Sequence, residues 1–434
     1  MLRGHEVRDA NDPAGVADAE APGSGAVQHR VGRPWRALAR RQAPAAGGWV
    51  ATRLGPLRTR LWLLALLVVV GVVYATFASA GWLRRWPLSG SFHDLQADAF
   101  RAGQISLLVE PPPELREANN PYDRANIEYW MLDASLYHGK YYSYWGPVPA
   151  LFQALGKSLL GVQRIVGDRY LAFFSLFVGA WSGALLIERM ARRLFGAIPR
   201  SLVVLGCLAL AFANPALHAA STGSTYYVAI VSGQAWLLAG LIPAFDAVWA
   251  ETGEARRRHL LLAGLGWSLA IASRVSLLGA VAGLIAVTAS LEGWPAERRW
   301  RRIVASAGWL GLPVAITGVS LLVYNEVRFD SYWEFGTGVQ LSGYPTLRFS
   351  SEYVLANLYS YVMRPFEWSC RFPYAFQEWW LGVEAFPKGF PLSSDYMAHE
   401  PVVGWLWAVP LCWLSPLAFV FAPRPFSLRE RNCR

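Results

Sequence analysis

Three polar residues that could carry acid–base chemistry stand together early in the chain. His93, Asp94 and Asp98 lie in a long stretch, residues 91–151, that is rich in acids, tyrosines and tryptophans. A carboxylate can act as a general base that takes the proton of an acceptor hydroxyl. If residues 94–102 form a short helix, Asp94 and Asp98 share one face and could share a site or a divalent metal. We expect Asp94 to be the base; the alternative is that these are solvated loop acids.

A second polar cluster occupies residues 133–142. We expect two short extended arms around a turn at His138 and Gly139, which present Lys140, Tyr141 and Tyr142. Lysine binds phosphate as a point charge, and interfacial tyrosines can pack on a lipid tail or a sugar ring. Asp133 is predicted to support the base. The alternative is an ordinary polar hairpin anchored by interfacial aromatic residues.

Further candidates for donor binding follow later in the chain. Arg274 interrupts an apolar run and offers bidentate contact to phosphate. His93 is grouped with these donor-binding candidates. The long polar stretch at 326–400 adds four weaker ones: Glu334, Arg371, His399 and Glu400.

The composition indicates a membrane protein. The chain has 434 residues, of which 54% are apolar and only 16% charged, whereas soluble domains carry about 25% charge. The net charge of +10 does not indicate nucleic acid, because the arginines flank long apolar runs, as the positive-inside rule requires. The four cysteines show no paired spacing, so neither a disulfide framework nor a metal site is indicated.

The hydropathy pattern predicts an all-α polytopic membrane protein with about eight spans. The order of domains is a disordered cytoplasmic tail (1–60), a transmembrane domain (61–423) with two large outer loops (84–169 and 326–400), and a second cytoplasmic tail (424–434). Both termini are expected inside. The predicted spans are 61–83, 170–187, two within 201–245, 260–273, 275–291, 303–325 and 401–423.

Three segments could lie in the membrane in more than one way. Residues 145–161 contain two prolines and Lys157, so we predict an interfacial helix rather than a span. Residues 350–363 are a second candidate of this kind. Residues 260–291 have basic flanks on both sides, which favours a hairpin with Arg274 at its outer turn. The alternative is one long tilted helix with a buried arginine, which would be costly.

The absence of common nucleotide-binding and hydrolase motifs limits the classes of reaction that the chain could catalyse. The sequence has no Walker loop, no GxGxxG, no HExxH and no GxSxG. An enzyme driven by a soluble cytoplasmic nucleotide is therefore unsupported. Chemistry on the outer face would need a donor that reaches the site from the bilayer, such as a polyprenyl-phosphate sugar.

Three features, in order, resemble a known family. They are an early outer-loop Asp94, the Pro-containing segment GPVPALFQALGKSLLG and a span that ends in RMARRLFG. Residues 60–250 resemble the C-type (GT-C) polyprenyl-phosphate-sugar-dependent membrane glycosyltransferases, such as the protein O-mannosyltransferase-like and aminoarabinose transferase-like enzymes. The later DASLYHGKYYSYWGPVPAL and YNEVRFDSYWEFGTGVQLSG resemble a bacterial branch. The resemblance implies transfer of a sugar to a glycan, lipid or protein acceptor at the outer face of a bacterial inner membrane, with Asp94 as base.

The chain departs from this family in two respects. Many relatives carry an acidic pair where this chain has His93 and Asp94, so Asp98 could be the key acid instead. Relatives also have more spans and a soluble outer domain. Two rival functions stay open: a transporter or flippase of lipid-linked sugars, which predicts broken helices at mid-membrane, and a surface-polysaccharide polymerase or ligase, which would use Arg364 and Arg371.

Overall fold

The structure is a computed structural model. It describes residues 61–195, 198–293, 299–342, 350–368, 375–376, 386–393, 396, 403–409, 413 and 416. The predicted cytoplasmic tails, 1–60 and 424–434, lie outside the described residues, and so does most of the predicted last span, 401–423.

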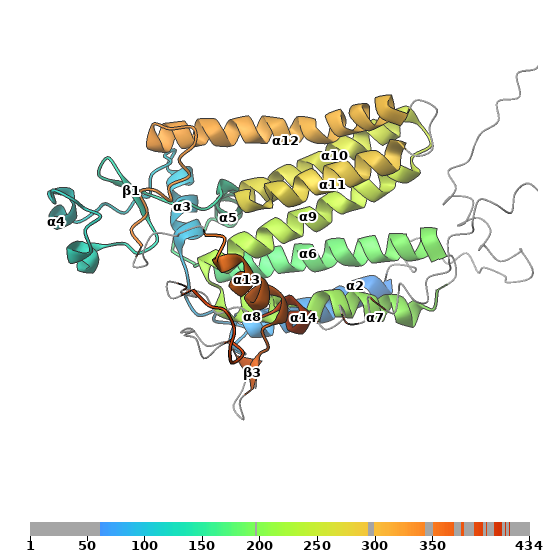
Figure 1. Cartoon of the computed structure of the whole chain (residues 1–434), viewed down its shortest axis with the longest axis horizontal. Helices are drawn as coiled ribbons and strands as arrows, with labels where there is room; N and C mark the ends of the chain where they lie inside the picture. The colour runs from blue at the N-terminus through green and yellow to red at the C-terminus, as the bar shows by residue number, and fades with distance from the viewer. Residues whose placement is uncertain are drawn as a thin grey trace, which may run out of the picture.

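The described chain is mostly helical, as the sequence predicts (Figure 1). Its elements are, in order, α2 (Leu61–Ala78), α3 (Phe92–Arg101), α4 (Pro113–Arg116), η1 (Arg124–Tyr129), β1 (Ser135–Tyr137), β2 (Lys140–Tyr142), α5 (Pro147–Leu160), α6 (Arg169–Met190), η2 (Ala191–Phe195), α7 (Arg200–Phe212), α8 (Ala216–Thr222), α9 (Thr225–Trp249), α10 (Gly253–Ser273), η3 (Val275–Leu277), α11 (Leu278–Gly293), α12 (Arg299–Phe329), α13 (Tyr353–Leu358), η4 (Tyr359–Met363), β3 (Glu367–Trp368), β4 (Ala375–Phe376) and α14 (Trp405–Ala408).

Five of the described helical segments are long and apolar enough to cross a membrane. They are α2, α6 with η2, α9, η3 with α11, and α12. A sixth crossing would be α7 with α8, a pair bent by 42° at the break between them. The prediction of eight spans is not confirmed. One reason is α10, whose first turns carry Arg256, Arg257 and Arg258 and which does not meet the same apolar criterion.

The turn at Arg274 is confirmed. Helix α10 ends at Ser273, Arg274 adopts an extended backbone, and α11 begins at Leu278 after the short η3 turn. The single long helix with a buried arginine is therefore excluded. The two spans predicted within residues 201–245 require a turn between them, and Gly223 takes a left-handed conformation between α8 and α9.

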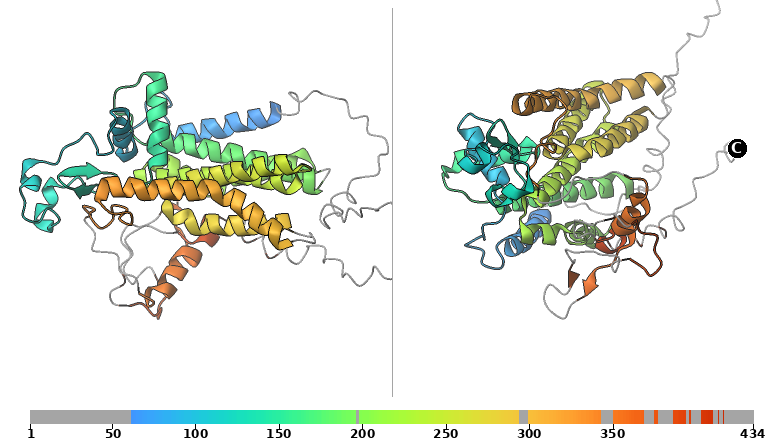
Figure 2. Two further views of the ribbon diagram at one scale, coloured as in Figure 1. Left: turned by 90° about the horizontal axis from the view of Figure 1, so that it is seen from above. Right: turned by 60° about the vertical axis from the view of Figure 1, so that its left-hand side comes forward.

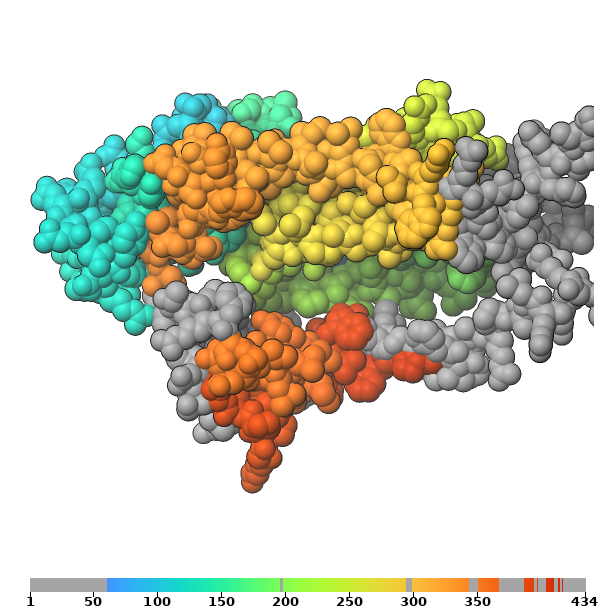
Figure 3. Space-filling model, turned by 45° about the horizontal axis from the view of Figure 1, so that its top comes forward, coloured from blue at the N-terminus to red at the C-terminus, as the bar shows by residue number. Residues whose placement is uncertain are grey.

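The long helices pack side by side as one bundle (Figures 1 and 3). Helix α9 lies between α6 and α10, and α12 covers α10 and α11. One core centres on Trp267 of α10, which is fully buried among residues of α9, α11 and α12. A second core surrounds Tyr74 of α2 and joins it to α6 and α8. The bundle is thus held by apolar contacts between neighbouring helices.

The backbones of α10 and α12 approach each other closely at Gly264, so a larger side chain there should destabilise the fold. A Cβ atom at Gly264 would overlap the carbonyl oxygen of Leu310. Because backbone cannot give way as a flexible side chain can, Gly264→Ala should lower the free energy of unfolding by about 1–3 kcal/mol. Thermal unfolding of the purified protein in detergent measures this. Gly311→Ala is the matched control, since a Cβ there meets nothing within 4 Å; equal loss in both variants would contradict the close-approach argument.

Helix α5 runs across the end of the bundle rather than along it (Figure 2). Pro147 stands in its first turn and Gly161, in a left-handed conformation, ends it. Its polar Gln153 and Lys157 are buried, whereas Leu155 and Leu159 are 54% and 77% exposed. This arrangement, polar inward and apolar outward, agrees with the predicted interfacial helix.

The two polar stretches meet beside α3. Strands β1 and β2 form the predicted hairpin, with His138 and Gly139 both at positive φ in the turn. Residues 339–341, which follow α12, run beside β1: Leu136 N donates to Val339 O at 2.9 Å, and Leu341 N to Ala134 O at 2.8 Å. The expected helix within 350–363 is present as α13 and η4.

Candidate functional site: a carboxylate network between α3 and α5

Helix α3 is fixed to the loop before α6 by two reciprocal sets of hydrogen bonds. Asp94 Oδ2 accepts from the backbone N–H groups of Val166 at 2.7 Å and Gly167 at 3.2 Å. In return, Asp168 Oδ1 accepts from the backbone N–H of Asp94 at 3.1 Å. Asp168 Oδ2 accepts from the Thr225 hydroxyl at 2.6 Å, at the start of α9. The start of α3 is therefore tied to both α6 and α9.

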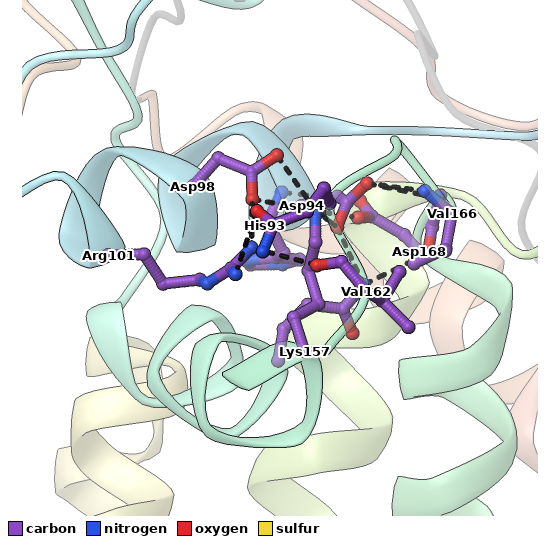
Figure 4. A network of polar contacts seen from close by, with 11 residues as sticks. His93, Asp94, Asp98, Arg101, Lys157, Val162, Val166 and Asp168 are labelled. Atoms are coloured by element: carbon purple, nitrogen blue, oxygen red, sulfur yellow. Dashed lines mark hydrogen bonds and ion pairs between the residues drawn. The ribbon is translucent and has the colours of Figure 1, made fainter. Parts of the chain in front are cut away.

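Lys157 of α5 joins the two predicted acids. Its Nζ donates to Asp94 Oδ1 at 2.9 Å and to the Asp98 carboxylate at 2.7 Å (Figure 4). Gln153, four residues earlier on α5, donates to the same Asp94 oxygen at 3.1 Å. The prediction that Asp94 and Asp98 share one helix face is confirmed. We call Asp94, Asp98, Gln153, Lys157 and Asp168 the α3–α5 network.

The two acids differ in access. Asp94 is 0% exposed and each of its oxygens accepts two hydrogen bonds. The Asp98 side chain is 20% exposed and is also paired with Arg101 at 3.2 Å. A general base must come within hydrogen-bond reach of the proton it removes. If one of these two carboxylates is a base, Asp98 meets this requirement better than Asp94, which is fully enclosed.

Burial shifts the pKa values of two groups in opposite directions. Desolvation raises the pKa of Asp168 to about 7, against the effect of its hydrogen bonds. Desolvation lowers the pKa of His93 to about 4, and the Thr225 backbone opposes this only weakly. Within the described structure, neither ring nitrogen of His93 completes a hydrogen bond. His93 is thus enclosed as a neutral ring and does not face an open donor-binding site.

The network does not fit a divalent metal. The cation between Asp94 and Asp98 is the ammonium group of Lys157, which lies within hydrogen-bonding distance of both. Among the described residues, no three His, Cys, Asp or Glu side chains are grouped in a way that could hold a metal ion.

Two other predicted residues meet around Tyr144. Burial raises the pKa of the Tyr144 phenol, the charge of Asp133 raises it further, and Arg274 opposes the shift. Arg274 donates to the Tyr226 hydroxyl at 3.0 Å and lies over the Tyr226 ring. Asp133 accepts from Gln340 at 3.2 Å, and desolvation raises its pKa. We call these five residues the Tyr144 group; it places an acid and a cation near one phenol.

The remaining predicted residues are placed differently. Lys140 is exposed on β2, as expected, but Tyr141 and Tyr142 are buried rather than presented. Tyr141 packs in an apolar core with Leu341, and Tyr142 lies against Phe329.

Glu334 orders its own turn, because Oε1 accepts from the backbone N–H groups of Gly336 and Gly338. Arg371, His399 and Glu400 lie outside the described residues.

Sequence reasoning missed Gln153, Lys157 and Asp168 as members of the network. The available signal was on α5: Gln153 and Lys157 are four residues apart, so they share the face opposite Leu155 and Leu159. Two polar residues on one face of an otherwise apolar helix indicate a buried polar partner. Asp168 carried no such signal, since it precedes α6 as many helix-capping aspartates do.

Comparisons of the chain with family models, curated proteins and solved structures find no match.

Proposed function

We propose that this chain is a membrane glycosyltransferase that moves a sugar from a polyprenyl-phosphate donor to an acceptor hydroxyl. The observation that carries the proposal is the position of Asp98. It is a partly exposed carboxylate on the first helix after an apolar helix, fixed against α5, whose exposed leucines face outward. A donor dissolved in a bilayer could reach such a carboxylate from the apolar side.

In this proposal each charged group has one task. Asp98 removes the proton of the acceptor hydroxyl as the oxygen attacks the sugar carbon, and the lipid phosphate leaves with the bonding electrons. Lys157, which is itself held by Asp94, holds the Asp98 carboxylate in place. Arg274, paired with Tyr226, is the cation that would bind the donor phosphate, as bidentate geometry permits.

The test is transfer of radiolabelled sugar from polyprenyl-phosphate donors by the purified protein. Asp98→Asn should reduce transfer by about 10²–10⁴-fold, the usual contribution of general base catalysis. Thermal unfolding should stay near that of wild type, because Asp98 is not enclosed. Glu110→Gln is the control, since it removes an acid that is 79% exposed in the same outer region. Full activity of Asp98→Asn would overturn the assignment of the base.

One feature favours a transporter or flippase of lipid-linked sugars as a second candidate. Helices α7 and α8 form a bent pair, and broken helices are typical of transporter binding sites. The same radiolabelled donor separates the two functions. Release of the sugar from its lipid indicates transfer, whereas movement of the intact donor between leaflets of a vesicle, with no cleavage, indicates a flippase.

A further inference from the structure

A second polar site lies at the end of the bundle opposite to the α3–α5 network. A pocket of about 260 Å³ opens between α10, α11 and α12. Its lining includes Arg256 and Arg257 of α10, Glu292 of α11, and Arg302, Ser306 and Trp309 of α12. It is larger than a single ion needs and somewhat smaller than the roughly 300–1,000 Å³ of sites for drug-sized ligands. We call it the arginine pocket.

The arginine pocket carries excess positive charge. Arg256 Nε lies 3.0 Å from Glu292 Oε2, and this glutamate is almost fully buried, so one arginine is neutralised. Arg257 Cζ lies 5.9 Å from the centroid of the Trp309 ring, a distance at which a cation and an aromatic ring attract each other. Within the described parts of the chain, neither Arg257 nor Arg302 forms an ion pair. Two guanidinium groups are therefore left for an anion.

The N-termini of α10 and α12 add to the positive electrostatic potential of the arginine pocket. Gly253, the first residue of α10, lines the pocket, and α12 begins at Arg299, one turn before Arg302. The N-termini of helices favour anions, because their backbone N–H groups and dipoles point outward. Guanidinium groups bind phosphate with bidentate geometry. The chemistry of the pocket is thus that of a phosphate-binding site.

The surroundings indicate that this phosphate belongs to a lipid. Next to the pocket, α11 and α12 are among the least covered of the candidate spans, with 22% and 17% of their apolar windows buried. Leu291 and Val304 are 47% and 68% exposed beside the pocket opening. Acyl chains can lie along these side chains while the headgroup enters the pocket. Basic pockets between helices at the cytoplasmic end bind anionic headgroups in other membrane proteins.

We propose that the arginine pocket binds the phosphate headgroup of an anionic phospholipid, with Arg257 and Arg302 as its ligands. This site is independent of the proposed transfer reaction, since it lies at the other end of the bundle. It would attach α10 and α12 to the lipid leaflet on that side.

Native mass spectrometry of the full chain, released from micelles that contain phosphatidylglycerol or phosphatidylcholine, tests the proposal. Wild type should retain phosphatidylglycerol at least tenfold more tightly than phosphatidylcholine. The double variant Arg257→Gln/Arg302→Gln should lose this preference. Arg258→Gln/Arg301→Gln removes the same charge from neighbouring positions outside the pocket lining and should keep it. Equal retention by the pocket variant and wild type would overturn the proposal.

Two further measurements distinguish loss of lipid binding from poor folding, and a lipid ligand from soluble phosphate. Ala305→Leu narrows the pocket without removing an arginine, so it should weaken retention of phosphatidylglycerol even if the double variant folds poorly. Addition of inorganic phosphate separates a lipid from a soluble ligand. If phosphate alone displaces the lipid at equal concentration, the site prefers no lipid and the lipid assignment is overturned; if phosphatidylglycerol stays bound, the assignment is supported.

Discussion

Replacement of Lys157 by methionine should lower the free energy of unfolding by about 3–5 kcal/mol, the usual cost of leaving one member of a buried ion pair unpaired. Lys157 is 3% exposed and its ammonium group lies 2.9 Å from a carboxylate that has no exposure of its own. Methionine has a similar length but no charge, so the enclosed Asp94 carboxylate would lose its cationic partner. The measurement is thermal or denaturant unfolding in detergent.

The comparison that isolates this effect is a double-mutant cycle. Asp94→Asn removes the charge that Lys157 neutralises, so Asp94→Asn/Lys157→Met should lose less than the sum of the two single variants. Lys140→Met is the control for loss of a lysine, since Lys140 is exposed on β2. Simple additivity in the cycle would mean that the two groups do not interact energetically, contrary to their geometry.

The pH dependence of stability should reveal two opposing groups that stand side by side at the start of α3. The pKa of Asp168 is raised from 3.8 to about 7 in the folded chain, so between these values the folded state binds more protons and stability falls as pH rises. The pKa of His93 is lowered from 6.5 to about 4, so between pH 4 and 6.5 the unfolded state binds more protons and stability rises with pH. The two slopes largely cancel in wild type between pH 4 and 6.5.

Replacing either His93 or Asp168 alone should expose the pH dependence of stability that comes from the other group. His93→Phe should leave the Asp168 slope, so stability falls by about 3 kcal/mol from pH 4 to 6.5, since one pKa unit corresponds to about 1.4 kcal/mol. Asp168→Asn should leave the His93 slope, so stability rises by a similar amount over the same range. Melting temperatures measured across this range for wild type and both variants provide the test. Slopes of the same sign in the two variants would contradict the assigned shifts.

Local patterns were sufficient to predict much of the fold. Long uncharged runs predicted the helices that became α2, α6, α9 and α12, because a helix satisfies the backbone hydrogen bonds of a segment in lipid without any other segment. Arg274 between two apolar runs predicted the hairpin of α10 and α11. His138 and Gly139 predicted the β-turn, since both tolerate the positive φ that a two-residue hairpin needs.

The candidate site was predicted only in part, because its decisive contacts join distant residues. The four-residue spacing of Asp94 and Asp98 placed them on one face of α3, but nothing local indicated that Lys157, which is 63 and 59 residues away from them, would reach both. Asp94 is predicted as the base, and the structure adds that its carboxylate is fully buried. Tyr141 and Tyr142 were expected at the surface for a related reason: their burial depends on Phe329, the last residue of α12, and on Leu341, which follows that helix.

The hydrogen bond between Asp168 and Thr225 has a consequence for how the chain assembles during synthesis. Helix α3 and the loop before α6 emerge from the ribosome early, but Thr225, which provides the shortest contact of Asp168, belongs to α9. The end of the bundle that holds α3 and α5 therefore cannot complete its polar contacts until α7, α8 and the start of α9 have been made. Until that point Asp168 lacks the hydrogen bond from the Thr225 hydroxyl. The insertion of α9 next to α6 is therefore the step that completes the polar contacts of the earlier helices.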